Sequence, residues 1–100
     1  MNAQELTQGG LEDGFMPLPT PDMDAEALFE LGRMYSTGTG GAPLDLVSAH
    51  MILNLAAMRG SQAARDFRRE LSREMEQDDI AAAQRAARQW IDQGRVALSA

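Results

Sequence analysis

The chain has 100 residues, which is enough for one small domain. It contains no cysteine, which excludes a disulfide framework and a cysteine-based metal site. Its formal charge of −6 counts against nucleic acid or an acidic membrane surface as the primary partner. The chain shows neither a run of roughly 18 to 20 apolar residues that would span a bilayer nor the basic start of a secretory signal, so we expect a cytoplasmic protein with no membrane partner.

Residues 1–21 are expected to form a flexible tail, because glycine and proline recur there without a sustained period. The tail contains one short apolar patch, Phe15-Met16-Pro17-Leu18. Thr20 and Pro21 then resemble a helix entry, with threonine as the cap and proline in the first turn. The folded domain is therefore expected to occupy residues 22–95.

The spacing of apolar residues predicts a first helix over about 22–36, with acids gathered in its first turns, where the helix dipole favours negative charge. Its apolar stripe comprises Ala27, Leu28, Leu31, Met34 and Tyr35. Phe29 lies about 150° from that stripe, at roughly 100° per residue, with Gly32 as a nearby point for close approach. Phe29 is therefore the apolar residue of this helix that departs from the stripe.

A glycine-rich break, residues 38–43, separates the first helix from the second. Gly38 stands where helices commonly end in a left-handed conformation, and Asp45 is placed to cap the next helix through its side chain. That helix is predicted over about 46–59, and its middle is apolar nearly all round, which indicates burial on more than one side. The two helices are expected to form an antiparallel hairpin.

A third helix is predicted over about 61–75 and a fourth over about 79–93, with Asp78 and Asp79 among the residues expected to cap the fourth. Trp90 is the largest apolar side chain, and we expect it to anchor the fourth helix on the third. The predicted fold class is all-α, with about four helices in antiparallel hairpins behind a flexible N-terminal tail.

Small residues, glycines and one tyrosine fall in phase along the first hairpin, at Ala27, Leu31, Gly32, Tyr35, Gly38, Gly40, Asp45, Ala49, Ala56, Ala57, Gly60 and Ala64. With this pattern the chain resembles one full repeat, at about residues 27–62, of the SLR (Sel-one-like repeat) family of tetratricopeptide-like helical hairpins. It departs from the family pattern by one extra residue in the turn and by Ile52 and Leu53, which replace an aromatic pair. The resemblance implies an α-solenoid fragment with residues 61–94 as capping helices, and a protein-binding scaffold with no attached chemistry.

The residues whose types could serve catalysis, phosphate binding or metal binding are expected to have structural roles here. His50 is the single histidine, and no cysteine or second histidine completes a metal site with it. The glycines at 38–41 are expected to form a turn rather than a phosphate loop, because the chain has no lysine. The third helix carries a basic patch that interleaved acids largely neutralise, which favours a solvated face: Arg65, Arg68, Arg69 and Arg73. We expect no catalytic residue, no cofactor and no metal.

One repeat cannot bury both of its faces, so we expect either a compact four-helix array closed by the fourth helix or a dimer. The expected function is a non-catalytic protein–protein interaction module, an adaptor or regulatory scaffold, whose partner is another protein or its own copy and not nucleic acid. A self-assembling structural homodimer is the alternative, and a small enzyme or enzyme subunit is the third possibility.

In a stack of such repeats the first helix packs against the preceding repeat, and none is seen before this one, so the resemblance implies that one side of the first helix is open. The expected partner-binding surface is that open side, comprising Glu26, Phe29, Glu30 and Arg33. Two covers are possible for it: the apolar patch at 15–18 folding back, or another chain. Fold-back is favoured, because a tethered segment has a high effective concentration.

Overall fold

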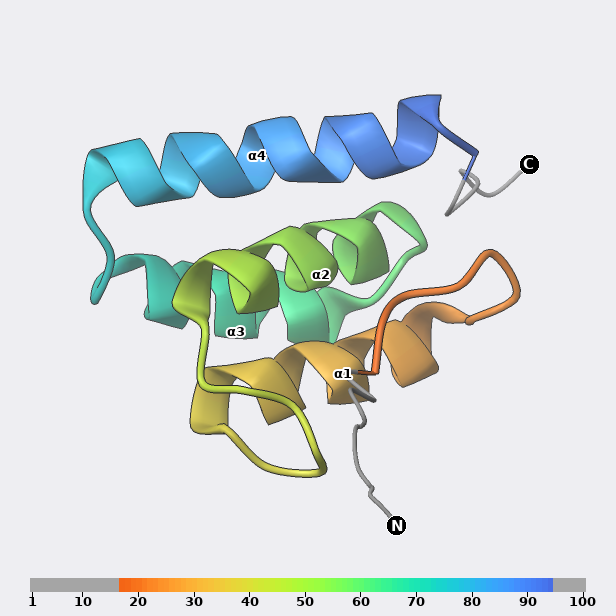
Figure 1. Cartoon of the computed structure of the whole chain (residues 1–100), viewed down its shortest axis with the longest axis horizontal. Helices are drawn as coiled ribbons and strands as arrows, with labels where there is room; N and C mark the ends of the chain where they lie inside the picture. The colour runs from red at the N-terminus through yellow and green to blue at the C-terminus, as the bar shows by residue number, and fades with distance from the viewer. Residues whose placement is uncertain (1–16, 95–100) are drawn as a thin grey trace, which may run out of the picture.

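The computed structural model describes residues 17–94, and within this range the chain forms four helices and no strand (Figure 1). The helices are α1 (Ala25–Thr37), α2 (Leu46–Met58), α3 (Gln62–Ser72) and α4 (Gln77–Asp92). The predicted all-α class with four helices is therefore confirmed. None of the described helices is long and apolar enough to cross a bilayer.

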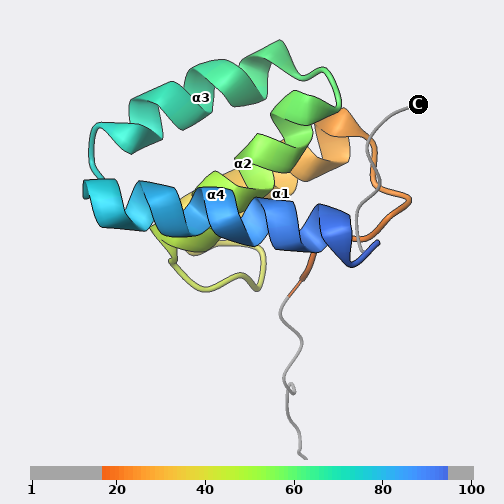
Figure 2. The same ribbon diagram turned by 90° about the horizontal axis from the view of Figure 1, so that it is seen from above.

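The second helix, α2, is the centre of the fold. Every residue from Ala49 to Ala57 is buried, and α2 packs against α1, α3 and α4. Figure 2 shows α2 passing beneath α4, with α3 on its other side. The prediction that an apolar helix of this kind is buried on several sides is confirmed, because each neighbouring helix covers a different part of its circumference.

Gly38 and Asp45 have their predicted local roles in the segment between α1 and α2. Gly38 has φ 69°, in the left-handed region, and its N–H donates to the Met34 carbonyl at 2.8 Å. The Asp45 carboxylate accepts from the backbone N–H of Ser48 at 3.2 Å and thereby caps α2.

Close contact between α1 and α2 depends on Gly32. A Cβ atom at Gly32 would lie 2.7 Å from Cδ2 of Leu53, so only glycine fits this crossing without a shift of Leu53. Gly32 therefore faces α2, and its predicted place beside Phe29 on the open side is wrong. The reason is geometric: residues three apart on a helix are separated by about 60° around its axis, which is enough to place one against the core and the other at its edge.

The entry to α1 differs from the prediction. Asp24, and not Thr20, is the N-cap, and its carboxylate accepts from the Ala27 N–H at 2.8 Å. The Thr20 carbonyl instead accepts from the Met23 N–H at 3.2 Å, so Pro21 occupies the second position of a turn, which its fixed φ favours. The helix consequently begins at Ala25.

The segment before α1 is held against the hairpin by hydrogen bonds. Tyr35, on α1, donates from its hydroxyl to the Pro17 carbonyl at 2.6 Å. Arg59, just after α2, donates to the carbonyls of Met23 and Pro21 at 2.8 and 3.1 Å. These bonds tie residues 17–23 to both helices of the hairpin.

The fourth helix docks differently from the prediction, because α4 packs on α2 rather than on α3. Buried Ala83 and Ala87 give α4 a narrow face that fits closely against the core, while Trp90 is half-buried at the edge of the core. The expected caps Asp78 and Asp79 lie inside the first turn of α4, and the N-cap is Glu76, whose side chain makes no cap hydrogen bond.

Candidate functional site

The predicted partner-binding face of α1 has a neighbour within the chain. Phe29 is half-buried, and its ring meets the ring of Phe67 on α3 edge-on, with centroids 6.1 Å apart and an interplanar angle of 87°. The premise that this side of α1 has no intramolecular neighbour is therefore wrong at Phe29. Packing of both α1 and α3 on α2 brings the two aromatic rings together.

On the α1 face, Arg33 contacts both Phe29 and Glu30. The guanidinium carbon of Arg33 lies 5.8 Å from the centroid of the Phe29 ring, and its Nη1 pairs with a Glu30 carboxylate oxygen at 3.4 Å. Glu26 is also exposed. The side chains of the Arg33–Glu30 pair are 53% and 58% exposed, so their ion pair adds little stability. A partner-binding role for these four residues stays a prediction.

Of the apolar patch at 15–18, only Pro17 and Leu18 belong to the part of the chain that the structure describes. Phe15 and Met16 lie outside the described residues, whereas Pro17 contacts Tyr35 and the Leu18 side chain is 49% exposed. Tyr35 lies on a different side of α1 from Phe29.

The positions that carry the repeat resemblance have distinct structural roles. Gly38, Gly40 and Gly60 have φ values of 69°, 64° and 106°. Ala27 is exposed. The buried positions are Leu31, Gly32, Tyr35, Ala49, Ala56, Ala57 and Ala64.

A closed set of hydrogen bonds joins α2 to α3, and we call it the polar ring: His50, Asn54, Arg68 and Ser72. Arg68 Nη1 donates to Asn54 Oδ1 at 2.6 Å, and Ser72 Oγ donates to the Arg68 carbonyl at 2.9 Å. Because the single hydroxyl proton of Ser72 is used in that bond, its oxygen accepts from His50 Nε2, 2.9 Å away. His50 Nδ1 is then the acceptor for the Asn54 amide, at 3.5 Å.

The polar ring requires a neutral histidine. Burial, followed by the positive charge of Arg68, lowers the pKa of His50 below its ordinary value. Burial also lowers the pKa of Arg68, with the charges of Arg65 and Arg69 adding to the effect. The structural role expected for His50 thus has a specific form: it joins α2 to α3.

Arg68 is half-buried in the α2–α3 contact, so its predicted place on a solvated basic face is wrong. The long apolar stem of arginine lets the side chain pass along a buried surface while its head bonds to Asn54. The spacing of the four residues of the polar ring along the sequence could have indicated this contact, but it was not recognised from the sequence. His50 and Asn54 are four residues apart on α2, as are Arg68 and Ser72 on α3, so each pair shares one face of its helix.

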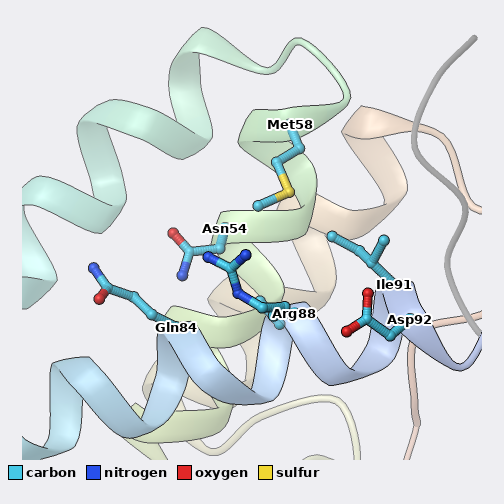
Figure 3. Close-up of a pocket in the computed structure, with 7 residues that line it drawn as sticks. Asn54, Met58, Gln84, Arg88, Ile91 and Asp92 are labelled. Carbon is cyan, nitrogen blue, oxygen red and sulfur yellow. The ribbon is translucent and has the colours of Figure 1, made fainter.

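A pocket of about 470 Å³ lies along α2 and α4, and we call it the α2–α4 groove (Figure 3). Its lining residues are Asn54, Met58, Gln84, Ala87, Arg88, Ile91 and Asp92. Figure 3 shows the Arg88 side chain extending from α4 toward α2, with Met58 pointing into the space between the helices. Sequence reasoning did not identify this groove, although Met58 ends the apolar run of α2 at a position that remains 49% exposed.

The groove combines apolar surface with one unpaired cation. Within residues 17–94, Arg88 forms no ion pair, and the three ion pairs present belong to Arg33, Arg69 and Arg73. In the same part of the chain no group of three or more His, Cys, Asp or Glu side chains is placed to hold a metal ion. Asp92 also lines the groove, so the arrangement offers a ligand shape, apolar contact and one charge of each sign.

Comparisons with protein-family models, with curated proteins and with solved structures find no match to this chain. The resemblance to Sel-one-like repeats therefore rests on the residues of the α1–α2 hairpin. Function is inferred from that resemblance together with the α2–α4 groove and the α1 face.

Proposed function

We propose that the chain is a non-catalytic protein–protein interaction module, an adaptor or regulatory scaffold of the cytoplasm built on a Sel-one-like repeat. The observation that carries this proposal is the α2–α4 groove, which leaves Met58 half-exposed on the most buried helix of the fold. A groove whose floor is a core helix presents its side chains in fixed positions, because that helix is held on three sides.

The composition of the groove favours a protein partner. Methionine and arginine are enriched at protein interfaces, and here Met58 and Arg88 line the same pocket. Ile91 extends the apolar surface along α4, and Gln84 supplies a hydrogen-bonding amide at its other end. The chain's formal charge of −6 disfavours nucleic acid and acidic membranes as competitors for this surface.

A second candidate is self-assembly into a homodimer. Two large apolar side chains outside the groove favour it: Leu44 is 68% exposed and Leu18 is 49% exposed. Exposed apolar side chains of this size gain free energy from any contact that removes them from water.

Site-specific photocrosslinking in native extract tests the proposal. A photoreactive side chain is placed in separate variants at Met58 in the groove, at Glu30 on the α1 face, and at Thr39 in the exposed turn as the control. We expect an adduct with another protein at Met58 that the Thr39 variant lacks. An adduct of two copies of this chain supports the homodimer instead, and an adduct at Glu30 alone moves the binding surface to α1. Identical patterns at all three positions, or no adduct at any, contradict an interaction module.

A further inference from the structure

We propose that the α2–α4 groove binds an amphipathic helix of a partner protein, which presents a carboxylate to Arg88 and apolar side chains to Met58 and Ile91. This inference rests on the proposed function and specifies the chemistry of the partner. Helix-in-groove binding is a recurrent mode of recognition, and its requirements are an apolar floor, polar edges and room for a helix.

The pocket of about 470 Å³ provides room for side chains of a bound helix. Only residues 73–76 connect α3 and α4, and consecutive helices joined by so short a link commonly pack side by side. Here each packs on α2 instead, and Figure 2 shows them diverging from their connection with α2 between them. The residues that line the groove come from α2 and α4, and none comes from α3.

The apolar part of the groove suits two neighbouring anchors on one helix face. Met58 lies on α2 and Ile91 on α4, and the buried Ala87 is one helical turn before Ile91. Methionine is unbranched and adapts its shape to the side chain it meets, so the floor can accept more than one apolar anchor. Side chains three or four residues apart on a bound helix point in the same direction and would enter the groove together.

The unpaired Arg88 favours a helix that places a carboxylate beside it. Arg88 has no ion-pair partner within residues 17–94, even though Asp92 follows it by one turn of α4. Asn54, the other polar group on the floor, already accepts a hydrogen bond from Arg68. A carboxylate entering the groove therefore meets the free donors of Arg88, with the positive charge of Arg68 behind the floor.

The same charges set the orientation of the bound helix. Along α4, Arg88 lies between Gln84 and Asp92, and Asp92 is the last residue of the helix (Figure 3). An acid near Arg88 is attracted, but a second acid near Asp92 is repelled, so the carboxylate belongs on one half of the partner helix only.

Fluorescence anisotropy with the full chain tests the inference. The probe is a labelled helical peptide of about 18 residues, roughly five turns, with leucines along one face and glutamates beside them on its first half. A matched peptide carries glutamine in place of each glutamate. We expect the acidic peptide to bind about fivefold more tightly than the glutamine peptide, with the difference shrinking at high salt.

Two arginine variants on the same helix locate the effect. Arg88→Gln is expected to remove the preference of about fivefold for the acidic peptide over the glutamine peptide. Arg85→Gln is the matched control, because Arg85 is exposed on α4 and does not line the groove. Met58→Glu is expected to abolish binding of the acidic peptide, since it places a like charge and a polar group on the apolar floor.

Three results overturn the inference. The first is equal binding of both peptides, and the second is an equal effect of Arg88→Gln and Arg85→Gln. The third is a concentration-dependent increase in mass that Met58→Glu abolishes while no peptide binds, which makes a second copy of the chain the occupant. An adduct of Met58 with another protein in the crosslinking experiment, together with either of the first two results, leaves the proposed function standing and removes only the acidic helix as its partner. The third result, together with an adduct of two copies of this chain, replaces the proposed function by the homodimer.

Discussion

The hydrogen bond of 2.6 Å from Arg68 Nη1 to Asn54 Oδ1 joins the polar ring to the floor of the α2–α4 groove. Asn54 is 6% exposed, so its carbonyl has little access to water and depends on Arg68 for a donor. The backbone carbonyl of Arg68 in turn accepts a hydrogen bond from the Ser72 hydroxyl, at the other end of the polar ring. Asn54 therefore belongs both to the contact between α2 and α3 and to the lining of the proposed binding surface.

Removing one member of this contact is expected to cost more than removing both. Asn54→Leu leaves the Arg68 guanidinium half-buried without its acceptor, and we expect it to lower the free energy of unfolding by about 1–3 kcal/mol. The double variant Asn54→Leu with Arg68→Met replaces both polar groups by apolar ones and should lose less than the sum of the single variants. Urea unfolding of the three variants measures the difference, and strictly additive losses would show that the two side chains do not interact.

Acid is expected to destabilise the fold through His50. Its pKa is lowered in the folded state, so at a pH below the unfolded value of about 6.5 the unfolded chain binds the extra proton more readily. The stability contributed by neutral His50 is therefore fully present above about pH 6.5 and is lost as the pH falls toward the lower folded pKa.

The matched variant for this effect is His50→Gln, which keeps hydrogen-bonding atoms but does not titrate. Urea midpoints are measured for both proteins at about pH 7.5 and about pH 5, on either side of the ordinary histidine pKa. We expect the wild-type midpoint to fall further than the variant's over this interval. Equal falls would mean that carboxylates alone govern the acid sensitivity.

The glycine turn is expected to tolerate asparagine better than valine at Gly38. Its φ of 69° disfavours a β-branched residue, and a Cβ atom there would lie 3.2 Å from Cβ of Leu44. Gly38→Val should cost about 1–3 kcal/mol, whereas Gly38→Asn should cost less, because asparagine adopts the left-handed region more readily. Thermal or urea unfolding distinguishes them, and equal stability of the two variants would contradict a left-handed turn at this position.

The burial of α2 could be predicted from the sequence because the residues of this helix alone indicate its surroundings. An apolar run from Met51 to Met58, interrupted only by Asn54, indicates burial on several sides whichever helices provide it. Gly38 and Asp45 are likewise predictable from local backbone requirements, namely a left-handed residue at the end of one helix and a cap at the start of the next. Both have their predicted roles. Such signals require no knowledge of the rest of the chain.

What the sequence does not specify is which buried faces meet. The small buried residues Ala83 and Ala87 show that α4 has a core face, but they do not distinguish α2 from α3 as its neighbour. The meeting of Phe29 and Phe67 depends in the same way on two docking angles that no local pattern encodes. The groove depends on those docking angles. The sequence positions of Met58 and Arg88 therefore do not predict that the two residues line the same groove.

The contact between Phe29 and Phe67 is expected to couple α1 to α3. Edge-on aromatic pairs contribute about 0.5–1.5 kcal/mol beyond their buried area. Unfolding free energies of Phe29→Ala, Phe67→Ala and the double variant should show a coupling energy of about that size. Independent effects of the two substitutions would mean that the α1 face is open at Phe29 and remains available to a partner.

Chemical-shift mapping by NMR tests most directly whether the α2–α4 groove is the binding surface. The isotopically labelled full chain is titrated with the acidic helical peptide, and the backbone amide and side-chain methyl signals are followed residue by residue. The predicted result is that the largest changes occur at Met58, Ala87, Arg88 and Ile91, which line the groove. Changes centred on Phe29, Glu30 and Arg33 of the α1 face, with the groove signals unmoved, would contradict it.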